Sequence, residues 1–121
     1  MFEIRPEHMD AFKDDQRRKA MKRLCGLLPD LWPGLCITLG ADGVSEWVDK
    51  GFEKAKAYGL PSVDGGTRYV HLMFMLVNPD FDTDERTSWA GTILNWKGAP
   101  EGLKLAALEK RARQVAEAAM E

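Results

Sequence analysis

The longest apolar run in the chain extends from Tyr69 to Val77, and His71 is its only polar member. This run is too short to cross a bilayer, which needs about 20 apolar residues. Most of its residues are unbranched helix formers, and a helix that is apolar on all sides is a buried one. We therefore predict a central core helix over residues 66–77, with a buried strand as the alternative. Residues 64–67 offer capping side chains for its start, and Pro79 cannot continue it.

An amphipathic pattern before this run predicts a long first helix from Pro6 to Leu28. Its inward stripe follows helical spacing and comprises Met9, Phe12, Gln16, Ala20, Leu24 and Leu27, with Met21 and Leu28 beside it. Pro29, and then Pro33 with Gly34, are expected to end this helix. Residues 30–43 are punctuated by proline and glycine, so we expect a turn there with one short helical turn.

A second helix is predicted to open at Asp42, with Asp42 as its cap, and to end at Gly59. Its predicted inner face consists of Val44, Trp47, Val48, Gly51, Phe52, Ala55 and Tyr58. Gly51 lies within this face, where the lack of a side chain would let another helix approach closely. Pro61 follows the predicted end.

Two more helices are predicted after the central one. The segment from Asp82 to Glu85 resembles a capping box and would start a helix that runs to Leu94 and buries Trp89 and Ile93. The last helix is predicted from about Pro100 to the end of the chain. Its inward residues would be Leu105, Leu108, Ala112, Val115 and Ala119, with Lys104, Glu109, Lys110, Arg113 and Glu117 outside. The pattern predicts an all-α single domain, residues 1–121, with about five helices in a bundle.

The amino-acid composition indicates the class of protein. The chain is 45% hydrophobic and 30% charged, which is typical of a globular domain rather than a disordered one. A net charge of -2 favours neither nucleic acid nor a membrane surface as partner. The first residues lack a signal-peptide pattern, so we expect a cytoplasmic protein. Cys25 and Cys36 are then expected to be free thiols, although pairing between them stays open.

The residue chemistry predicts no catalytic, metal-binding or cofactor-binding site. The acids between Asp80 and Asp84 alternate as in a calcium loop, but the sixth and twelfth positions, Glu85 and Gly91, do not fit an EF-hand. We expect no calcium there. His8 and His71 lie far apart, without an acid or cysteine at metal spacing. No nucleophile has an adjacent base, and no phosphate-binding loop is present, so we predict that the protein is not an enzyme.

A basic group near the start of the chain could suggest nucleic acid. It comprises Arg17, Arg18, Lys19, Lys22 and Arg23. Asp14 and Asp15 adjoin it, and no helix-turn-helix spacing is evident. We expect a solvated helix face rather than a DNA contact.

The aromatic residues outside the helical stripes are the candidates for a protein interface. Trp47 and Trp89 fall on inner faces and are expected in the core, whereas Trp32 and Trp96 fall in predicted loops. Together with Phe81, which stands between two aspartates, these loop residues are our candidate interface anchors. Satellite core positions are the alternative for the tryptophans, and Phe81 could instead pack as a hydrophobic staple on the next helix.

Short segments in a fixed order carry a family resemblance. They are Ile4-Arg5-Pro6-Glu7, Ala57-Tyr58-Gly59-Leu60, Leu72-Met73-Phe74, Asn78-Pro79-Asp80-Phe81-Asp82, Trp89-Ala90 and Ile93-Leu94. This order resembles small helical proteins that are encoded in bacterial type VI secretion gene clusters, near VgrG or PAAR spike genes and toxic-effector genes. The resemblance spans most of the chain, although this chain has Asn78 where that family has glycine.

The resemblance implies a non-enzymatic partner of secreted proteins. The leading hypothesis is an adaptor or chaperone that binds a type VI effector or spike protein. The first alternative is an immunity protein that covers the active site of a toxin. A small DNA-binding regulator, or an enzyme without a recognisable motif, is the alternative from another class. No catalytic or cofactor-binding residue is carried over from the resemblance.

Overall fold

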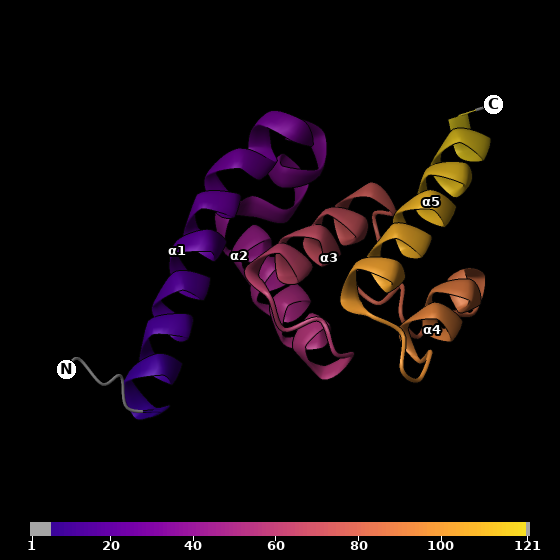
Figure 1. Ribbon diagram of the computed structural model, residues 1–121. Helices are drawn as coiled ribbons and strands as arrows, with labels where there is room; N and C mark the ends of the chain where they lie inside the picture. Colours follow the sequence, from indigo (N-terminus) through magenta and orange to yellow (C-terminus); the bar gives the residue numbers. More distant parts are fainter. Residues whose placement is uncertain (1–5, 121) are drawn as a thin grey trace.

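The computed structural model describes the backbone of residues 6–120 and the side chains of residues 15–118, and its regular structure is entirely helical. Five α-helices and one 3-10 turn follow one another as α1 (Pro6–Leu31), α2 (Pro33–Ala57), α3 (Val63–Met75), η1 (Glu85–Thr87), α4 (Ser88–Leu94) and α5 (Glu101–Met120). The predicted all-α bundle is thereby confirmed. Figure 1 shows α3 in the middle of the molecule, with α1 and α2 on one side and α5 on the other.

The central helix is the one predicted from the apolar run. Helix α3 packs against α1, α2 and α5, and Tyr69, Val70, Met73 and Phe74 are fully buried. Its start differs from the prediction, because Ser62 rather than a residue of 64–67 caps it. The Ser62 backbone is extended and its Oγ accepts a hydrogen bond from Gly65 N at 2.8 Å, which satisfies a helix-start donor.

Pro29 does not end the first helix, contrary to the prediction, whereas the helix does end before Pro33, as predicted. Pro29 lies inside α1, which continues to Leu31, and Trp32 N still donates to Leu28 O at 2.8 Å. Pro33 then opens α2 at its first position, where a missing N–H costs nothing. The predicted turn over residues 30–43 is therefore wrong for most of its length, because α2 already begins at Pro33.

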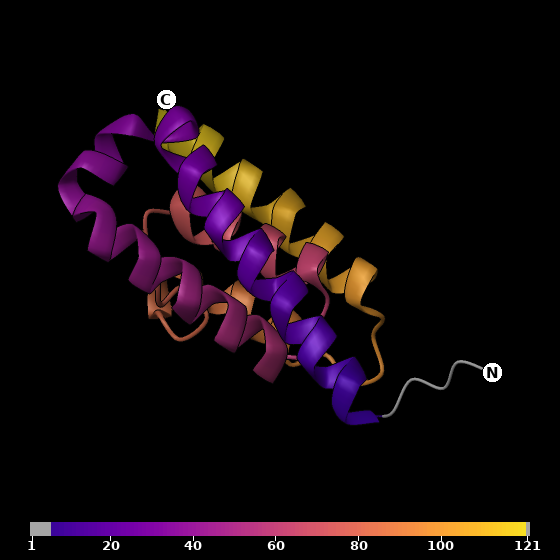
Figure 2. The same ribbon diagram turned by 90° about the vertical axis from the view of Figure 1, so that its left-hand side faces the viewer.

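A kink at Gly40 divides α2 into two helical segments. The residue has φ 73 and ψ 170, a conformation that costs glycine little and other residues much. Asp42 lies inside the second segment rather than at a cap, which corrects the predicted start of this helix. We refer to the bend formed by the end of α1 and the first segment of α2 as the α1–α2 corner; Figure 2 shows it at the upper left.

The end of α2 and its packing on α3 follow the prediction. Gly59 has φ 79, and Leu60 N donates to Ala55 O at 2.8 Å, as in a Schellman motif. Gly51 is buried against α3: a Cβ atom there would lie 2.5 Å from Val70 Cγ2. The predicted close helix approach at Gly51 is confirmed.

Fewer side chains of the outer helices α1 and α5 are buried than their apolar stripes predicted. On α1, Leu24 and Leu28 are buried, whereas Gln16 is exposed and Leu27 is 50% exposed. Both were placed on the inner face, but α2 and α3 cover only the side of α1 around Leu24 and Leu28. The predicted inner positions Met9 and Phe12 lie outside the residues whose side chains are described.

Helix α5 buries Leu105, Leu108 and Ala112 as predicted, and Val115 is half-buried. The predicted Ala119 lies outside the described side chains. Lys104, expected outside, is only 8% exposed. Its Nζ donates to Leu94 O at 3.0 Å and to Tyr58 O at 3.2 Å. The ammonium group thus satisfies carbonyls at the ends of α4 and α2, where a cation is also favoured by the helix dipoles.

Candidate functional site

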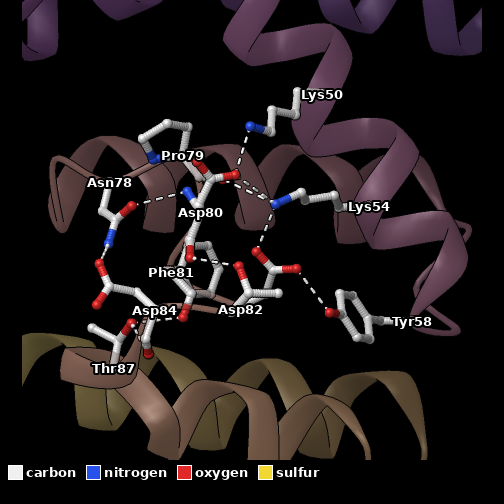
Figure 3. Close-up of polar contacts among 11 residues, drawn as sticks. Lys50, Lys54, Tyr58, Asn78, Pro79, Asp80, Phe81, Asp82, Asp84 and Thr87 are labelled. Carbon is white, nitrogen blue, oxygen red and sulfur yellow. Dashed lines mark hydrogen bonds and ion pairs between the residues drawn. The ribbon is translucent and has the colours of Figure 1, made fainter.

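The acidic turn between α3 and α4 is fastened to α2 by charged hydrogen bonds (Figure 3). Asp82 Oδ1 lies 2.6 Å from Lys54 Nζ, and Asp82 Oδ2 accepts a hydrogen bond from Tyr58 OH at 2.8 Å. The Asp82 side chain is only 4% exposed. A buried carboxylate needs such partners, because an unpaired one would cost several kcal/mol.

Asp80 extends the same network towards solvent. Its Oδ1 lies 2.6 Å from Lys50 Nζ and 3.1 Å from Lys54 Nζ. Hydrogen bonds from both lysines hold the pKa of Asp80 below its ordinary value. Burial lowers the pKa of Lys54, but its hydrogen bonds to Asp82 and Asp80 outweigh this effect and raise it overall.

The capping residue of this turn is Asp84, not Asp82 as predicted. Asp84 Oδ1 accepts from Arg86 N at 2.9 Å at the start of η1, and Asp84 Oδ2 accepts from Asn78 Nδ2 at 2.9 Å. The hydrogen bonds from Arg86, through its side chain and backbone, lower the pKa of Asp84. Asp82 does not cap the helix because its carboxylate is hydrogen-bonded to Lys54 and Tyr58 instead.

These contacts occupy the acids that resembled a calcium loop. Within the described part of the chain, no group of three or more His, Cys, Asp or Glu residues is arranged to hold a metal ion. Asp80, Asp82 and Asp84 each have cationic or amide partners from the protein. The expectation that this turn binds no calcium stays a prediction, and the network is best interpreted as a support for the fold.

We expect the two tyrosines of the chain to ionise only far above their ordinary pKa. Burial and the hydrogen bond to Asp82 raise the pKa of Tyr58 to about 12, and burial raises that of Tyr69, whose hydroxyl is buried without a hydrogen-bond partner among the described residues. An unfolded tyrosine has a pKa of ~10. The stability from the protonated phenols is therefore present below pH ~10 and is lost as pH rises towards the folded pKa values.

Ultraviolet difference absorbance during an alkaline titration measures the ionisation of the two tyrosines directly. Tyrosinate should form together with the loss of far-ultraviolet circular dichroism, and the Tyr58→Phe variant isolates Tyr69. A full tyrosinate signal near pH ~10 from protein that is still helical would contradict the burial of both rings.

The predicted interface anchors occupy three different environments. Phe81 is fully buried, with its ring centroid 4.9 Å from that of Tyr69, so it is a core residue and not a surface anchor. Trp32 is half-buried, and its ring centroid lies 5.5 Å from His71 and 5.8 Å from Phe74. Trp96 is 40% exposed and is the candidate with the most accessible surface. The structure therefore does not bring the three together.

The positions of the remaining aromatic and basic residues largely match those predicted from the sequence. Trp47 and Trp89 are half-buried rather than fully in the core. His71 is half-buried, and this burial lowers its pKa. On α1, Arg18, Lys22 and Arg23 are exposed, as expected for a solvated helix face.

An apolar hollow lies at the α1–α2 corner. This corner pocket has a volume of about 440 Å³. Its lining comprises Cys25, Pro29, Pro33, Cys36, Ile37, Gly40, Ala41 and Val44. It contains no charged side chain, and Ile37 at its edge is 82% exposed. This exposed aliphatic side chain adds apolar surface beside the hollow, and burial of apolar surface by a partner protein is favourable.

The two cysteines of the corner pocket are free thiols, as expected. Burial raises the pKa of both, and the nearby Asp49 carboxylate and the Cys36 thiol raise that of Cys25 further. A thiol with a raised pKa is protonated at neutral pH and a poor nucleophile. The chemistry of this pocket is therefore that of an apolar contact surface.

Sequence reasoning missed the corner pocket although its signal was present. Cys36, Ile37, Gly40, Ala41 and Val44 recur at three- and four-residue spacing, which is typical of helical segments, here on either side of the kink at Gly40. All of these residues except Val44 fall in the segment 30–43, for which a turn was predicted because proline and glycine interrupt it. Lys50, Lys54 and Tyr58 had an equally regular spacing, but their acidic partners Asp80 and Asp82 lie 24 to 30 positions away along the chain.

Comparisons with protein-family models, with curated proteins and with solved structures found no match. Within the described residues, no helix is long and apolar enough to cross a membrane.

Proposed function

We propose that this chain is a non-enzymatic protein-binding module, an adaptor or chaperone for a type VI secretion effector or spike protein. The corner pocket is the observation that carries the proposal. Its lining is apolar, and Ile37 projects beside it with 82% of its surface exposed. Burial of such a surface by a partner is favourable by about 25 cal/mol per Å² of apolar area. The type VI assignment is supported by the order of motifs in the sequence.

The shape of the surface favours an adaptor or chaperone over an immunity protein. The corner pocket is concave and receives a side chain or segment of the partner. Binding of an inserted segment is the mode that we expect of an adaptor or chaperone. The occupant we expect is an uncharged, apolar segment of the secreted protein, because no charge lines the pocket to pair with an ionic one.

Replacing Ile37 with glutamate tests this proposal with little risk to the fold, because the side chain is already exposed. The change puts a charge at the edge of the corner pocket, and loss of an anchor residue costs about 2 kcal/mol of binding, or about thirtyfold in affinity. Calorimetry with the effector or spike protein encoded beside this gene measures the effect. The melting temperature should stay unchanged.

Val63→Glu is the matched control. Val63 is 38% exposed, opens α3 and is not among the residues that line the corner pocket. This variant should bind as the parent protein does. Equal affinities for Ile37→Glu and the parent protein would remove the corner pocket from the interface, and no binding to either neighbouring protein would refute the type VI assignment.

A further inference from the structure

A second hollow lies between α4 and α5, and these helices lie on the other side of α3 from the α1–α2 corner (Figure 1). We call it the α4–α5 groove; its volume is about 500 Å³. It is lined by Trp89, Thr92 and Ile93 from α4 and by Ala107, Lys110, Arg111 and Gln114 from α5. Each set follows the three- and four-residue spacing of a single helix face. The groove is therefore built from two regular helix faces and not from loops.

The floor of the groove is apolar and its edge is cationic. Ile93 is 9% exposed, and Trp89 and Ala107 are half-buried, whereas Lys110 and Arg111 are exposed. Arg111 Nη1 donates to Gln114 Oε1 at 3.2 Å. No carboxylate lines the groove. Neither cation forms an ion pair with any other side chain of residues 15–118.

Apolar and charged side chains are also separated along the groove. The chain turns back between α4 and α5, so the residues nearest that turn share one end. Beside the groove and near that turn, the backbone N–H of Trp96 donates to Ile93 O at 3.1 Å. Trp96 is 40% exposed, and Leu103, one turn before Ala107 on α5, is 55% exposed. Lys110, Arg111 and Gln114 follow further along α5. The surface thus runs from an exposed apolar end to a cationic end.

We propose that the α4–α5 groove binds an amphipathic helix of a partner protein, with an apolar stripe and with carboxylates grouped at one end. Helix-in-groove recognition places apolar anchors at one-turn spacing into such a hollow, and Trp96 and Leu103 supply the contacting surface. The carboxylates pair with Lys110 and Arg111, which adds orientation and discrimination between partners. This inference rests on the protein-binding part of the proposed function.

A protein helix fits the groove better than a nucleic acid does. Nucleic-acid surfaces combine several cations along the backbone with stacking aromatic rings. The groove offers two cations, and its floor contains aliphatic side chains at Ile93 and Ala107. Because the groove and the corner pocket use different helices, both can be occupied at once. An adaptor needs two such separate surfaces to join two proteins, or two segments of one.

Fluorescence anisotropy with stapled helical peptides tests the proposal. The probe has a leucine stripe along one face and glutamates at one end, in two versions that place them at the N- or C-terminal end. A third version carries lysines in place of the glutamates. We expect one glutamate version to bind at least about tenfold more tightly than the lysine version, equivalent to about 1.4 kcal/mol.

Charge reversal on the protein supplies the matched comparison. K110E/R111E should abolish the preference for glutamate, whereas K22E/R23E makes the same change in net charge on the exposed face of α1 and should preserve it. Trp96→Ala should weaken both glutamate versions without loss of helical circular dichroism. Equal binding of the glutamate and lysine probes, or equal effects of the two charge reversals, would overturn the proposal. The proposal would also be overturned if a single-stranded DNA oligonucleotide bound more tightly than the peptides and if K110E/R111E abolished that binding.

The test of the α4–α5 groove can fail independently of the test of the corner pocket. Ile37→Glu should leave peptide binding at the α4–α5 groove unchanged. Peptide binding without any binding to the neighbouring effector or spike protein would keep the groove and refute the type VI assignment. Binding of that neighbour, lost with Ile37→Glu but without any peptide binding, would keep the corner pocket and refute the groove.

Discussion

Phe74→Asp is expected to unfold the domain. Phe74 is fully buried in the central helix, and its ring centroid lies 5.2 Å from Trp47 and 5.8 Å from Trp32. An aspartate there would lose these contacts and would place a carboxylate in the core without a partner. The two costs together are several kcal/mol or more, comparable with the whole stability of a small domain, about 5–15 kcal/mol.

Circular dichroism and urea unfolding measure this effect. Phe74→Leu is the control, because it keeps an apolar side chain and should cost much less while the protein stays folded. Val63→Asp introduces the same charge at the exposed start of α3, where the helix dipole favours it, and should leave the melting temperature nearly unchanged. A Phe74→Asp protein with native helicity and melting temperature would show that α3 is not the core of the domain.

Phe81→Ala is expected to lower the free energy of unfolding by about 3–5 kcal/mol, as truncation of a buried aromatic residue typically does. Phe81 is fully buried against Tyr69, and its carbonyl oxygen accepts a hydrogen bond from Thr87 Oγ1 at 2.6 Å. The side chain therefore anchors the acidic turn to the core. A surface anchor would give the opposite result, with unchanged stability and weakened partner binding.

Urea unfolding of Phe81→Ala and Trp96→Ala side by side distinguishes the two environments. Trp96 is 40% exposed, so its truncation should cost clearly less stability than that of Phe81. Lys54→Met is a useful companion, because it leaves Asp82 buried with Tyr58 as its remaining partner and should also destabilise the turn. Equal, small losses for Phe81→Ala and Trp96→Ala would show that Phe81 lies at the surface.

The sequence by itself determined the helical class of the fold and the identity of the central helix. Most of the apolar run requires burial, and on α3 Tyr69, Val70, Leu72, Met73 and Phe74 are buried, whereas Val77, beyond the end of the helix, is 61% exposed. Gly59 ends α2 because its positive φ disfavours any other residue. Gly51 lets α3 approach α2 closely because a side chain there would clash with α3. Helical spacing and a glycine that ends a helix depend on residues within a few positions of one another, which is why a sequence pattern can predict them.

Only the tertiary structure decided which side chains are covered and which charges meet. Phe81 turned inward because Lys54 and Tyr58 hold the acids on both sides of it, and Lys104 became buried because two helix ends present carbonyls to it. Pro29 was retained inside α1, and the corner pocket formed where Gly40 bends α2 over that helix. These outcomes depend on residues far apart along the chain, whose proximity no local pattern records. The two hollows and their different charge are consequently products of helix packing.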